Sequence, residues 1–149
     1  MQANATGREN ITLSGLLNGL SKKQAIDKFD GIAEFCELGS YLDFPVNTYS
    51  RGMAMRLSFA MATAFSPDIL LLDEWLGAGD LAFRKKAEAR MQELVASAGI
   101  LVLASHRLPL IKNNCDSCLW LEHGAVKMYG PAAEVVAEFR NEVKSDDAN

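Results

Sequence analysis

The amino-acid sequence predicts an α/β fold in which a helical N-terminal part precedes a parallel β-sheet. Two apolar runs, residues 69–72 and 100–104, are uninterrupted, as in the strands of a parallel sheet that is covered on both faces. A helical pattern separates these runs, so the order is strand, helix, strand. Upstream of residue 66, apolar residues instead recur at helical spacing.

We therefore divide the chain into three parts. Residues 1–66 form a helical part, and residues 67–143 form the α/β part. Residues 144–149 are polar and are expected to be a disordered tail.

The helical part is expected to begin after a frayed segment, residues 1–6. A short helix follows over residues 7–19. Ser21 and Gln24 have the spacing of a capping box, which satisfies the first amide groups of a helix reciprocally. One helix is expected from there to a stop at Gly39.

The last element of the helical part is a helix over residues 50–65. Pro45 and Asn47 predict a loop before it, and Ser50 is a good N-cap residue. The helix is apolar almost all round, which is typical of a buried helix.

The α/β part continues beyond its two strands. A short helix is expected near residues 109–113. Residues 119–121 and 125–128 then flank Gly124, which predicts a hairpin with the glycine in a tight turn. A last helix is expected to start at Pro131, because proline suits a first helical turn.

Composition excludes several classes of function. The 149 residues carry a formal net charge of −4 and no long basic run, so we expect no nucleic-acid partner. The apolar stretches are too short to cross a bilayer, and no signal peptide is present. We therefore expect a cytoplasmic protein that docks on the inner face of the cell membrane without spanning it.

Three cysteines are present, and an odd number without an export signal favours free thiols. Cys115 and Cys118 have the spacing of half a zinc site. No second pair of Cys or His accompanies them, so the sequence favours two small residues leading into a strand.

The polar residues that close the two predicted strands are the first candidate site. Ligands of parallel sheets bind at the carboxyl ends of the strands. Asp73 offers a hard oxygen ligand for Mg²⁺, and Glu74 could accept a proton from an attacking water. A neutral His106 could hydrogen-bond a terminal phosphate. Each residue also fits a structural role, the acids as a solvated strand end or helix cap.

The start of the helix at Ser50 is the second candidate site. A serine hydroxyl, free amides and Gly52 favour an anion there, although a plain N-cap explains the same residues. Arg51 and Arg56 lie in the first turns of this helix, where cations oppose the helix dipole. This mismatch suggests that one of them faces an anionic partner.

The order of these motifs resembles that of the ATP-binding-cassette ATPases. Residues 49–53 resemble their signature motif, Leu-Ser-Gly-Gly-Gln, with Ser50 and the second glycine, Gly52, retained. The resemblance implies the C-terminal part of a RecA-type P-loop NTPase core with an α-helical signature subdomain. It also implies that the nucleotide contacts are Ser50, Arg51, Gly52 and Met53.

The same resemblance implies roles for four further residues. Asp73 corresponds to the Walker B aspartate at Mg²⁺, and Glu74 to the catalytic glutamate. His106 corresponds to the switch histidine at the γ-phosphate of ATP. Asp80 corresponds to the aspartate of the loop that crosses the dimer interface.

Further motifs narrow the resemblance to exporters of O-antigen, capsular polysaccharide and teichoic acid. They are residues 7–11 upstream and 120–124 downstream. Such ATPases pair with an ABC-2 type membrane permease and dimerise, either as a homodimer or with a partner ATPase domain. The coupling helix of the permease is expected to dock near residues 7–40.

The P-loop, Gly-x-x-x-x-Gly-Lys-Ser/Thr, does not occur in the 149 residues. Met1 therefore looks like an internal start or a truncation. Without a P-loop the chain is expected to offer Ser50 and Gly52 in trans to a nucleotide held by a partner, and not to hold its own tightly. A non-catalytic interaction module is the alternative. A helicase-type P-loop protein is disfavoured, because the signature-like segment precedes the first strand.

Overall fold

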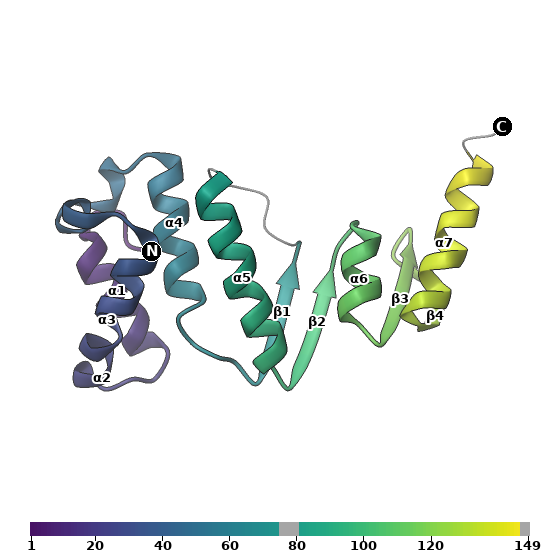
Figure 1. Ribbon diagram of the computed structural model, residues 1–149, viewed down its shortest axis with the longest axis horizontal. Helices are drawn as coiled ribbons and strands as arrows, with labels where there is room; N and C mark the ends of the chain where they lie inside the picture. The colour runs from purple at the N-terminus through teal and green to yellow at the C-terminus, as the bar shows by residue number, and fades with distance from the viewer. Residues whose placement is uncertain (75–80, 147–149) are drawn as a thin grey trace. The chain divides into compact units, whose positions relative to one another are not determined.

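The computed structural model describes residues 1–74 and 81–146, and Figure 1 traces their helices and strands. The chain forms two compact units. The helical unit holds residues 1–68 and helix α5 (Leu81–Ser97), and the sheet unit holds residues 69–74 and 99–146. Helix α5 thus packs with the helices that precede it, although the sequence placed it in the α/β part. The division at residues 66 and 67 stays a prediction.

The helical unit contains four helices before α5 and two short 3₁₀ turns. The helix expected to run from residue 22 to the stop before Gly39 is divided at Lys28, whose backbone stays in the helical region and joins the two pieces. The bounds are α1 Gly7–Leu17, α2 Lys22–Asp27, α3 Phe29–Cys36, η1 Gly39–Asp43, η2 Val46–Thr48 and α4 Arg51–Ala62.

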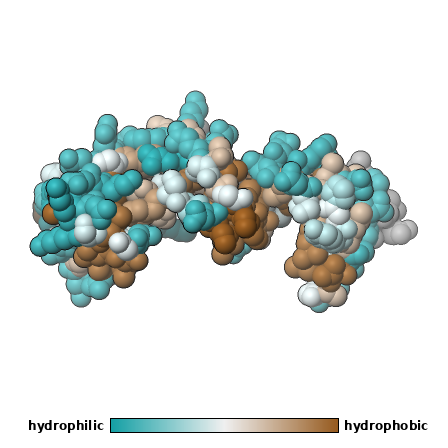
Figure 2. Space-filling model, turned by 90° about the horizontal axis from the view of Figure 1, so that it is seen from below, coloured by the Kyte–Doolittle hydropathy of each residue, from teal (hydrophilic) through white to brown (hydrophobic). Residues whose placement is uncertain are grey.

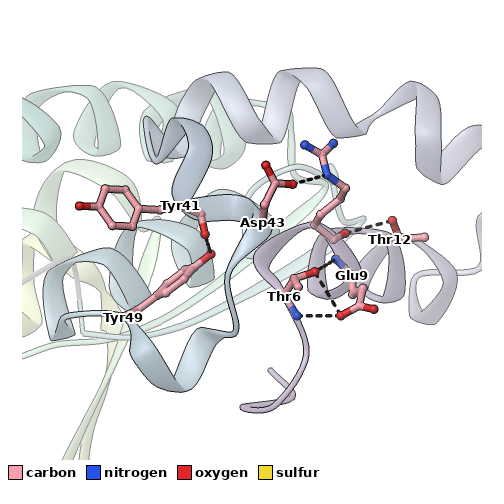
Figure 3. Close-up of polar contacts among 7 residues, drawn as sticks. Thr6, Glu9, Thr12, Tyr41, Asp43 and Tyr49 are labelled. Carbon is pink, nitrogen blue, oxygen red and sulfur yellow. Dashed lines mark hydrogen bonds and ion pairs between the residues drawn. The ribbon is translucent and has the colours of Figure 1, made fainter.

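The expectation of a frayed start was wrong, because buried Asn10 holds the N-terminal residues in place. Its Nδ2 donates to the carbonyl oxygens of Gln2, Ala5 and Thr6 at 3.0, 3.3 and 2.9 Å, and its Oδ1 accepts from the Gln2 amide at 2.7 Å. Thr6 also forms a capping box with Glu9 (Figure 3). A buried amide that meets several backbone groups orders the segment, because its own desolvation is otherwise costly.

Three phenylalanines form the centre of the helical unit. Phe83 of α5 contacts Phe35 and Phe59, with ring centroids 5.8 and 6.0 Å apart and nearly perpendicular planes. Edge-to-face pairs of this kind add to the free energy gained from burial. The buried apolar residues around them come from α1, α3, α4, α5 and the 3₁₀ segment between α3 and α4: Ile11, Ile32, Cys36, Leu38, Leu42, Val46, Leu57, Ala60, Met61 and Ala87.

Two basic residues fasten α5 to its neighbours. Lys86 donates to a carboxylate oxygen of Glu37 at 2.8 Å and to the carbonyl of Phe35 at 3.2 Å. Arg90 donates to the carbonyl of Thr63, at the end of α4, at 3.3 Å. Both cations also lie over the ring of Phe35. The carbonyls at a helix end lack partners within the helix, so Arg90 supplies one to α4.

We predict opposite effects of alanine at two helical glycines. A Cβ on Gly15 would lie 2.7 Å from the Cβ of Ala25 in α2, so Gly15→Ala forces α1 and α2 apart at a cost of about 1–3 kcal/mol. A Cβ on Gly31 would have no other atom within 4 Å, and Gly31→Ala gains about 1 kcal/mol of helix propensity. Urea unfolding followed by circular dichroism measures the stability of both variants. Equal shifts of their unfolding midpoints would contradict the close contact of α1 with α2 at Gly15.

The sheet unit contains two strand pairs and two helices. Strand β1 (Ile69–Asp73) pairs in parallel with β2 (Ile100–Ala104), which confirms the parallel sheet. Strand β3 (Ser117–Glu122) pairs with β4 (Ala125–Pro131) as an antiparallel hairpin. His123 and Gly124 make the two-residue turn, both with positive φ, so the predicted hairpin is confirmed.

Helices α6 (Leu108–Asn114) and α7 (Ala132–Asp146) complete this unit. Trp120 of β3 meets Phe139 of α7 edge to face, with centroids 5.0 Å apart. Helix α7 continues beyond Val143, and residues 147–149 lie outside the described residues. No helix in the described ranges is long and apolar enough to cross a membrane.

One apolar face of the parallel strands is exposed among the described residues. Alternate side chains of β1 and β2 are more than half exposed, and Leu71 reaches 71%. Their partners in register lie on the same face, because side chains alternate along a strand. The exposed set is Ile69, Leu71, Ile100 and Val102. Uninterrupted apolar strands are typical of a parallel sheet with both faces buried. In the described residues this face stays exposed, and Figure 2 shows apolar surface on the sheet unit.

Candidate functional site

The parallel register brings the ends of β1 and β2 together. Asp73 is the partner of Ala104, and the amide of Glu74 donates to the carbonyl of Ala104 at 2.9 Å. Ser105 and His106 follow directly on β2. The two polar strand ends that the sequence singled out therefore lie at one edge of the sheet.

Glu74 and His106 contact each other at this edge. Nδ1 of His106 lies 2.8 Å from Oε1 of Glu74, and both side chains remain accessible to solvent. Glu74 has a φ of 65°, in the left-handed region that a residue with a side chain seldom adopts. Unusual backbone of this kind is concentrated at functional sites.

The contact lowers the pKa of Glu74. Its largest cause is the hydrogen bond from His106, and the nearby positive charges add to it, while partial desolvation opposes it. The carboxylate is therefore ionised at neutral pH. Because the folded pKa lies below the unfolded one, the contact stabilises the fold above the unfolded pKa, and this stabilisation is lost as the pH falls through the folded pKa.

The contact also decides what His106 can donate. An ionised carboxylate only accepts hydrogen bonds, so the imidazole hydrogen lies on Nδ1. Nε2 of a neutral His106 is then an acceptor. The contact of His106 with a terminal phosphate stays a prediction.

We predict that His106→Ala raises the pKa of Glu74 towards the usual carboxyl value of about 4.3. The substitution removes the hydrogen bond that is the main cause of the lowered value. An NMR titration of the side-chain carboxyl carbons measures it. Glu37 is the internal control, since Lys86 is the main cause of its lowered pKa. An unchanged titration curve of Glu74 would assign the shift to another group.

Asp73 has the properties of a single-carboxylate ligand for Mg²⁺. It is exposed at the end of β1, and no described residue forms a hydrogen bond or ion pair with its carboxylate. In the described ranges, no group of three or more His, Cys, Asp or Glu side chains is placed to hold a metal ion. Mg²⁺ commonly takes one or two protein carboxylates and completes its shell with water and phosphate oxygens, so Asp73 fits this ion.

The signature-like segment begins α4 as expected. Ser50 is the N-cap, and its hydroxyl accepts from the amide of Met53 at 3.2 Å. Arg51 and Gly52 are exposed, and Met53 is half-buried. A Cβ on Gly52 would meet only the Ser50 hydroxyl, at 3.9 Å, so the chain's own packing does not require glycine there. The amides of Arg51 and Gly52 have no partner within the helix, so this exposed turn can offer them to an anion.

The two arginines near the start of α4 differ. Arg56 pairs with Glu37 at 3.2 Å and lies over the ring of Phe83, so its anionic partner is inside the helical unit. Arg51 forms no ion pair with any described residue. Of the two cations that oppose the helix dipole, Arg51 is the one available to an external anion.

Tyr49 has a structural role that the sequence did not reveal. Its hydroxyl donates to the carbonyl of Tyr41 at 2.6 Å (Figure 3). A Cβ on Gly7 would lie 2.5 Å from the same hydroxyl, so Tyr49 closes against the first turn of α1. The sequence feature that could have revealed this contact is Gly7, because a glycine often marks a close approach by another residue.

The structure thus brings together three of the predicted site residues in the sheet unit, namely Asp73, Glu74 and His106. The second group, Ser50 to Met53, lies in the helical unit. Asp80 lies outside the described residues.

No family model matches the chain, but individual proteins do. The Lactococcus lactis protein "Teichoic acids export ATP-binding protein TagH" is 42% identical over 97% of this chain and 31% of its own length. The Myxococcus xanthus "O-antigen export system ATP-binding protein RfbB" is 41% identical over 96% of this chain and 33% of its own length. The Yersinia enterocolitica "O-antigen export system ATP-binding protein RfbE" is 50% identical over 85% of this chain and 53% of its own length.

Solved structures agree with these relatives. One, described as "Structure of ATP binding subunit of ABC transporter", superposes with a TM-score of 0.73 at 25% identity, covering 93% of this chain and 58% of that one. CbiO1 from Clostridium perfringens, part of an ABC transporter complex, superposes with a TM-score of 0.57 at 19% identity over 95% of this chain and 57% of that one, which supports the fold. The chain spans about a third to a half of the length of its relatives by sequence.

Proposed function

Because the chain belongs to the ATP-binding-cassette ATPases, we propose that it is part of the ATP-binding subunit of an exporter of cell-surface polysaccharide or lipopolysaccharide. The subunit couples ATP hydrolysis to transport. The observation that carries this proposal is the contact of Glu74 with His106, beside Asp73, at the carboxyl ends of two parallel strands. This edge is where parallel sheets bind nucleotides.

In the proposed reaction Glu74 orients the attacking water and accepts its proton. A carboxylate ionised at neutral pH can accept this proton, and the hydrogen bond from His106 holds it in place. His106 holds that carboxylate through Nδ1, and its ring would contact the γ-phosphate of a bound nucleotide. The residues thus position the water and compensate charge, which are the main protein contributions to phosphoryl transfer.

Asp73 is proposed to hold Mg²⁺, directly or through water. Mg²⁺, when bound, neutralises charge on the phosphate oxygens of ATP. An exposed carboxylate without another described partner, directly before the proposed base, is a suitable ligand.

The segment from Ser50 to Met53 is proposed to contact ATP held by a partner ATPase domain, in a homodimer or a paired subunit. Its exposed first turn, together with Arg51, which has no ion-pair partner among the described residues, favours an anion. Asp80 is proposed to couple the two half-sites across the same interface. The chain's 149 residues contain no P-loop to bind the nucleotide of its own half-site.

The proposed membrane partner is an ABC-2 type permease, and the proposed location is the cytoplasmic face of the cell membrane. The relatives are named as parts of export systems. The docking surface is proposed to lie on residues 7–40, where exposed Leu17 and Ile26 on α1 and α2 offer apolar contacts.

A non-catalytic interaction module is the second candidate, because the exposed start of α4 can contact a partner subunit without hydrolysis by this chain. Such a module would still bind a complete partner subunit through the start of α4. In such a module Glu74 would not take part in ATP hydrolysis, whereas in the first candidate it would.

A graft tests the proposal. The region of the Yersinia enterocolitica relative that matches this chain is replaced by the chain, and ATP hydrolysis is measured. We expect the graft to hydrolyse ATP, because the relative supplies the remainder of its own length and this chain supplies Asp73, Glu74 and His106. A graft that folds and binds ATP but does not hydrolyse it would leave the interaction module as the better description.

A further inference from the structure

Backbone hydrogen bonds join the start of α1 to the segment that leads into α4. The amide of Gly7 donates to the carbonyl of Phe44 at 3.3 Å. The amide of Val46 donates to the carbonyl of Ala5 at 3.0 Å. These bonds hold the two 3₁₀ turns η1 and η2 against the first turn of α1. The signature-like turn, residues 50–53, comes directly after this segment.

Tyr49 connects the signature-like turn to these elements. It precedes Ser50 directly, and its half-buried ring packs against the core of the helical unit. Its hydroxyl donates to the carbonyl of Tyr41 in η1 at 2.6 Å (Figure 3). A Cβ on Gly7 would lie 2.5 Å from the same hydroxyl, so the first turn of α1 closes the space around it. Both the ring and the hydroxyl of Tyr49 are therefore held in place.

The signature-like turn itself has few contacts with other elements. Ser50, Arg51 and Gly52 are exposed, and no described residue outside α4 forms a hydrogen bond or ion pair with them. Tyr49 and Met53 flank these residues and pack on the core. Of these two side chains, Tyr49 has the hydrogen bond to another element. A hydrogen bond weakens steeply away from its preferred distance and angle, so it fixes an orientation that apolar packing alone does not.

We propose that Tyr49 is a positioning residue for the signature-like turn. Its hydroxyl, held by the carbonyl of Tyr41, fixes where the chain enters α4 and thus where Ser50 and the free amides of the turn point. Because the contact of this turn with ATP of a partner domain is itself a proposed function, the role of Tyr49 rests on it. Tyr49 does not touch the nucleotide. A misplacement of about 1 Å at a reacting group can cost about 100-fold in rate, so the entry to the turn matters.

Tyr49→Phe in the graft on the Yersinia enterocolitica relative tests this role, because it removes one oxygen atom and keeps the ring in the core. We expect kcat for ATP hydrolysis to fall by about tenfold or more, since the turn no longer meets the phosphate in its productive orientation. KM for ATP should change by less than about twofold, because the groups that hold each nucleotide before the half-sites meet lie outside this turn. Steady-state kinetics over a range of ATP concentrations measure both constants.

Tyr41→Phe is the matched control, because it removes the same atom from a neighbouring tyrosine. Tyr41 is 57% exposed, and no described residue forms a hydrogen bond with its hydroxyl. The carbonyl that accepts from Tyr49 belongs to the backbone and remains. We expect kcat and KM of this variant to stay within about twofold of the values of the unchanged graft. An equal fall of kcat in the two variants would show that the Tyr49 hydroxyl has no special role.

Two measurements separate positioning from a loss of folded protein. Urea unfolding gives the folded fraction of Tyr49→Phe under the assay conditions, and kcat is expressed per folded molecule. Hydrogen exchange followed by mass spectrometry reports on the turn, since the Ser50 hydroxyl accepts from the amide of Met53. We expect residues 51–55 to exchange faster in Tyr49→Phe and at the unchanged rate in Tyr41→Phe. A kcat per folded molecule equal to that of the unchanged graft would mean a purely structural role and overturn the proposal.

A further variant distinguishes failure of this role from failure of the proposed function. Gly52→Asp puts a negative charge where the phosphates of the partner's ATP are proposed to lie, and a Cβ there would meet only the Ser50 hydroxyl, at 3.9 Å. If Gly52→Asp lowers kcat and Tyr49→Phe does not, the turn meets ATP but Tyr49 does not position it. If Gly52→Asp hydrolyses ATP as fast as the unchanged graft, the turn meets no phosphate, and its proposed function and the role of Tyr49 are both wrong.

Discussion

Glu74→Gln in the grafted ATPase is expected to lower turnover by about 100- to 10,000-fold, the usual contribution of a positioned general base. The amide is nearly isosteric with the carboxylate but cannot accept the proton of the attacking water. ATP binding should remain, because Asp73 and the segment after Ser50 are unchanged. Single-turnover hydrolysis and equilibrium ATP binding, measured on the same preparation, separate the two effects.

A second glutamate serves as the matched control. Glu138 is exposed on α7, and Glu138→Gln makes the same chemical change away from the strand ends. We expect it to keep the turnover of the unchanged graft. If Glu74→Gln and Glu138→Gln hydrolyse ATP equally fast, Glu74 is not the base.

Phe83→Ala is expected to lower the free energy of unfolding of the helical unit by about 3–5 kcal/mol, the usual cost of removing a buried phenylalanine. Phe83 is 2% exposed and packs edge to face on Phe35 and Phe59. Arg56 also lies over its ring, with 4.9 Å to the centroid. The substitution leaves a cavity at the contact of α5 with α3 and α4, which cannot close without moving a helix.

The same change at an exposed phenylalanine is the control for stability. Phe44 is 55% exposed, so Phe44→Ala should change the free energy of unfolding by less than about 0.5 kcal/mol. Urea unfolding followed by far-ultraviolet circular dichroism measures both variants. Similar midpoints for the two would show that α5 does not depend on the phenylalanine cluster.

Local patterns predicted much of the architecture. The apolar runs identified β1 and β2, Gly124 identified the hairpin turn, and Ser50 identified the start of α4. Each of these depends on residues close together in the chain, where periodicity and capping chemistry act. The capping box at Thr6 was missed although Glu9 has the right spacing, because a polar start was interpreted as frayed.

Contacts between distant residues were not predictable in the same way. Lys86 and Glu37 are separated by 49 residues, and nothing in either segment indicates that α5 joins the helical unit. The role of Asn10 likewise depends on three carbonyls that converge only when the N-terminal segment folds back. Such contacts depend on the path of the whole chain, which local propensity does not specify.

The candidate site shows the same division. The sequence by itself determined which residues end the two parallel strands, because polar residues follow each apolar run directly. Ligands of parallel sheets bind at these carboxyl ends. Only the tertiary structure decided that Glu74 and His106, 32 residues apart, contact each other at 2.8 Å. That contact needs a left-handed backbone at Glu74 and the register of β1 on β2, and neither follows from the residues alone. Physically, residue identity supplies the acid and the imidazole, whereas the distance between them lowers the pKa of Glu74.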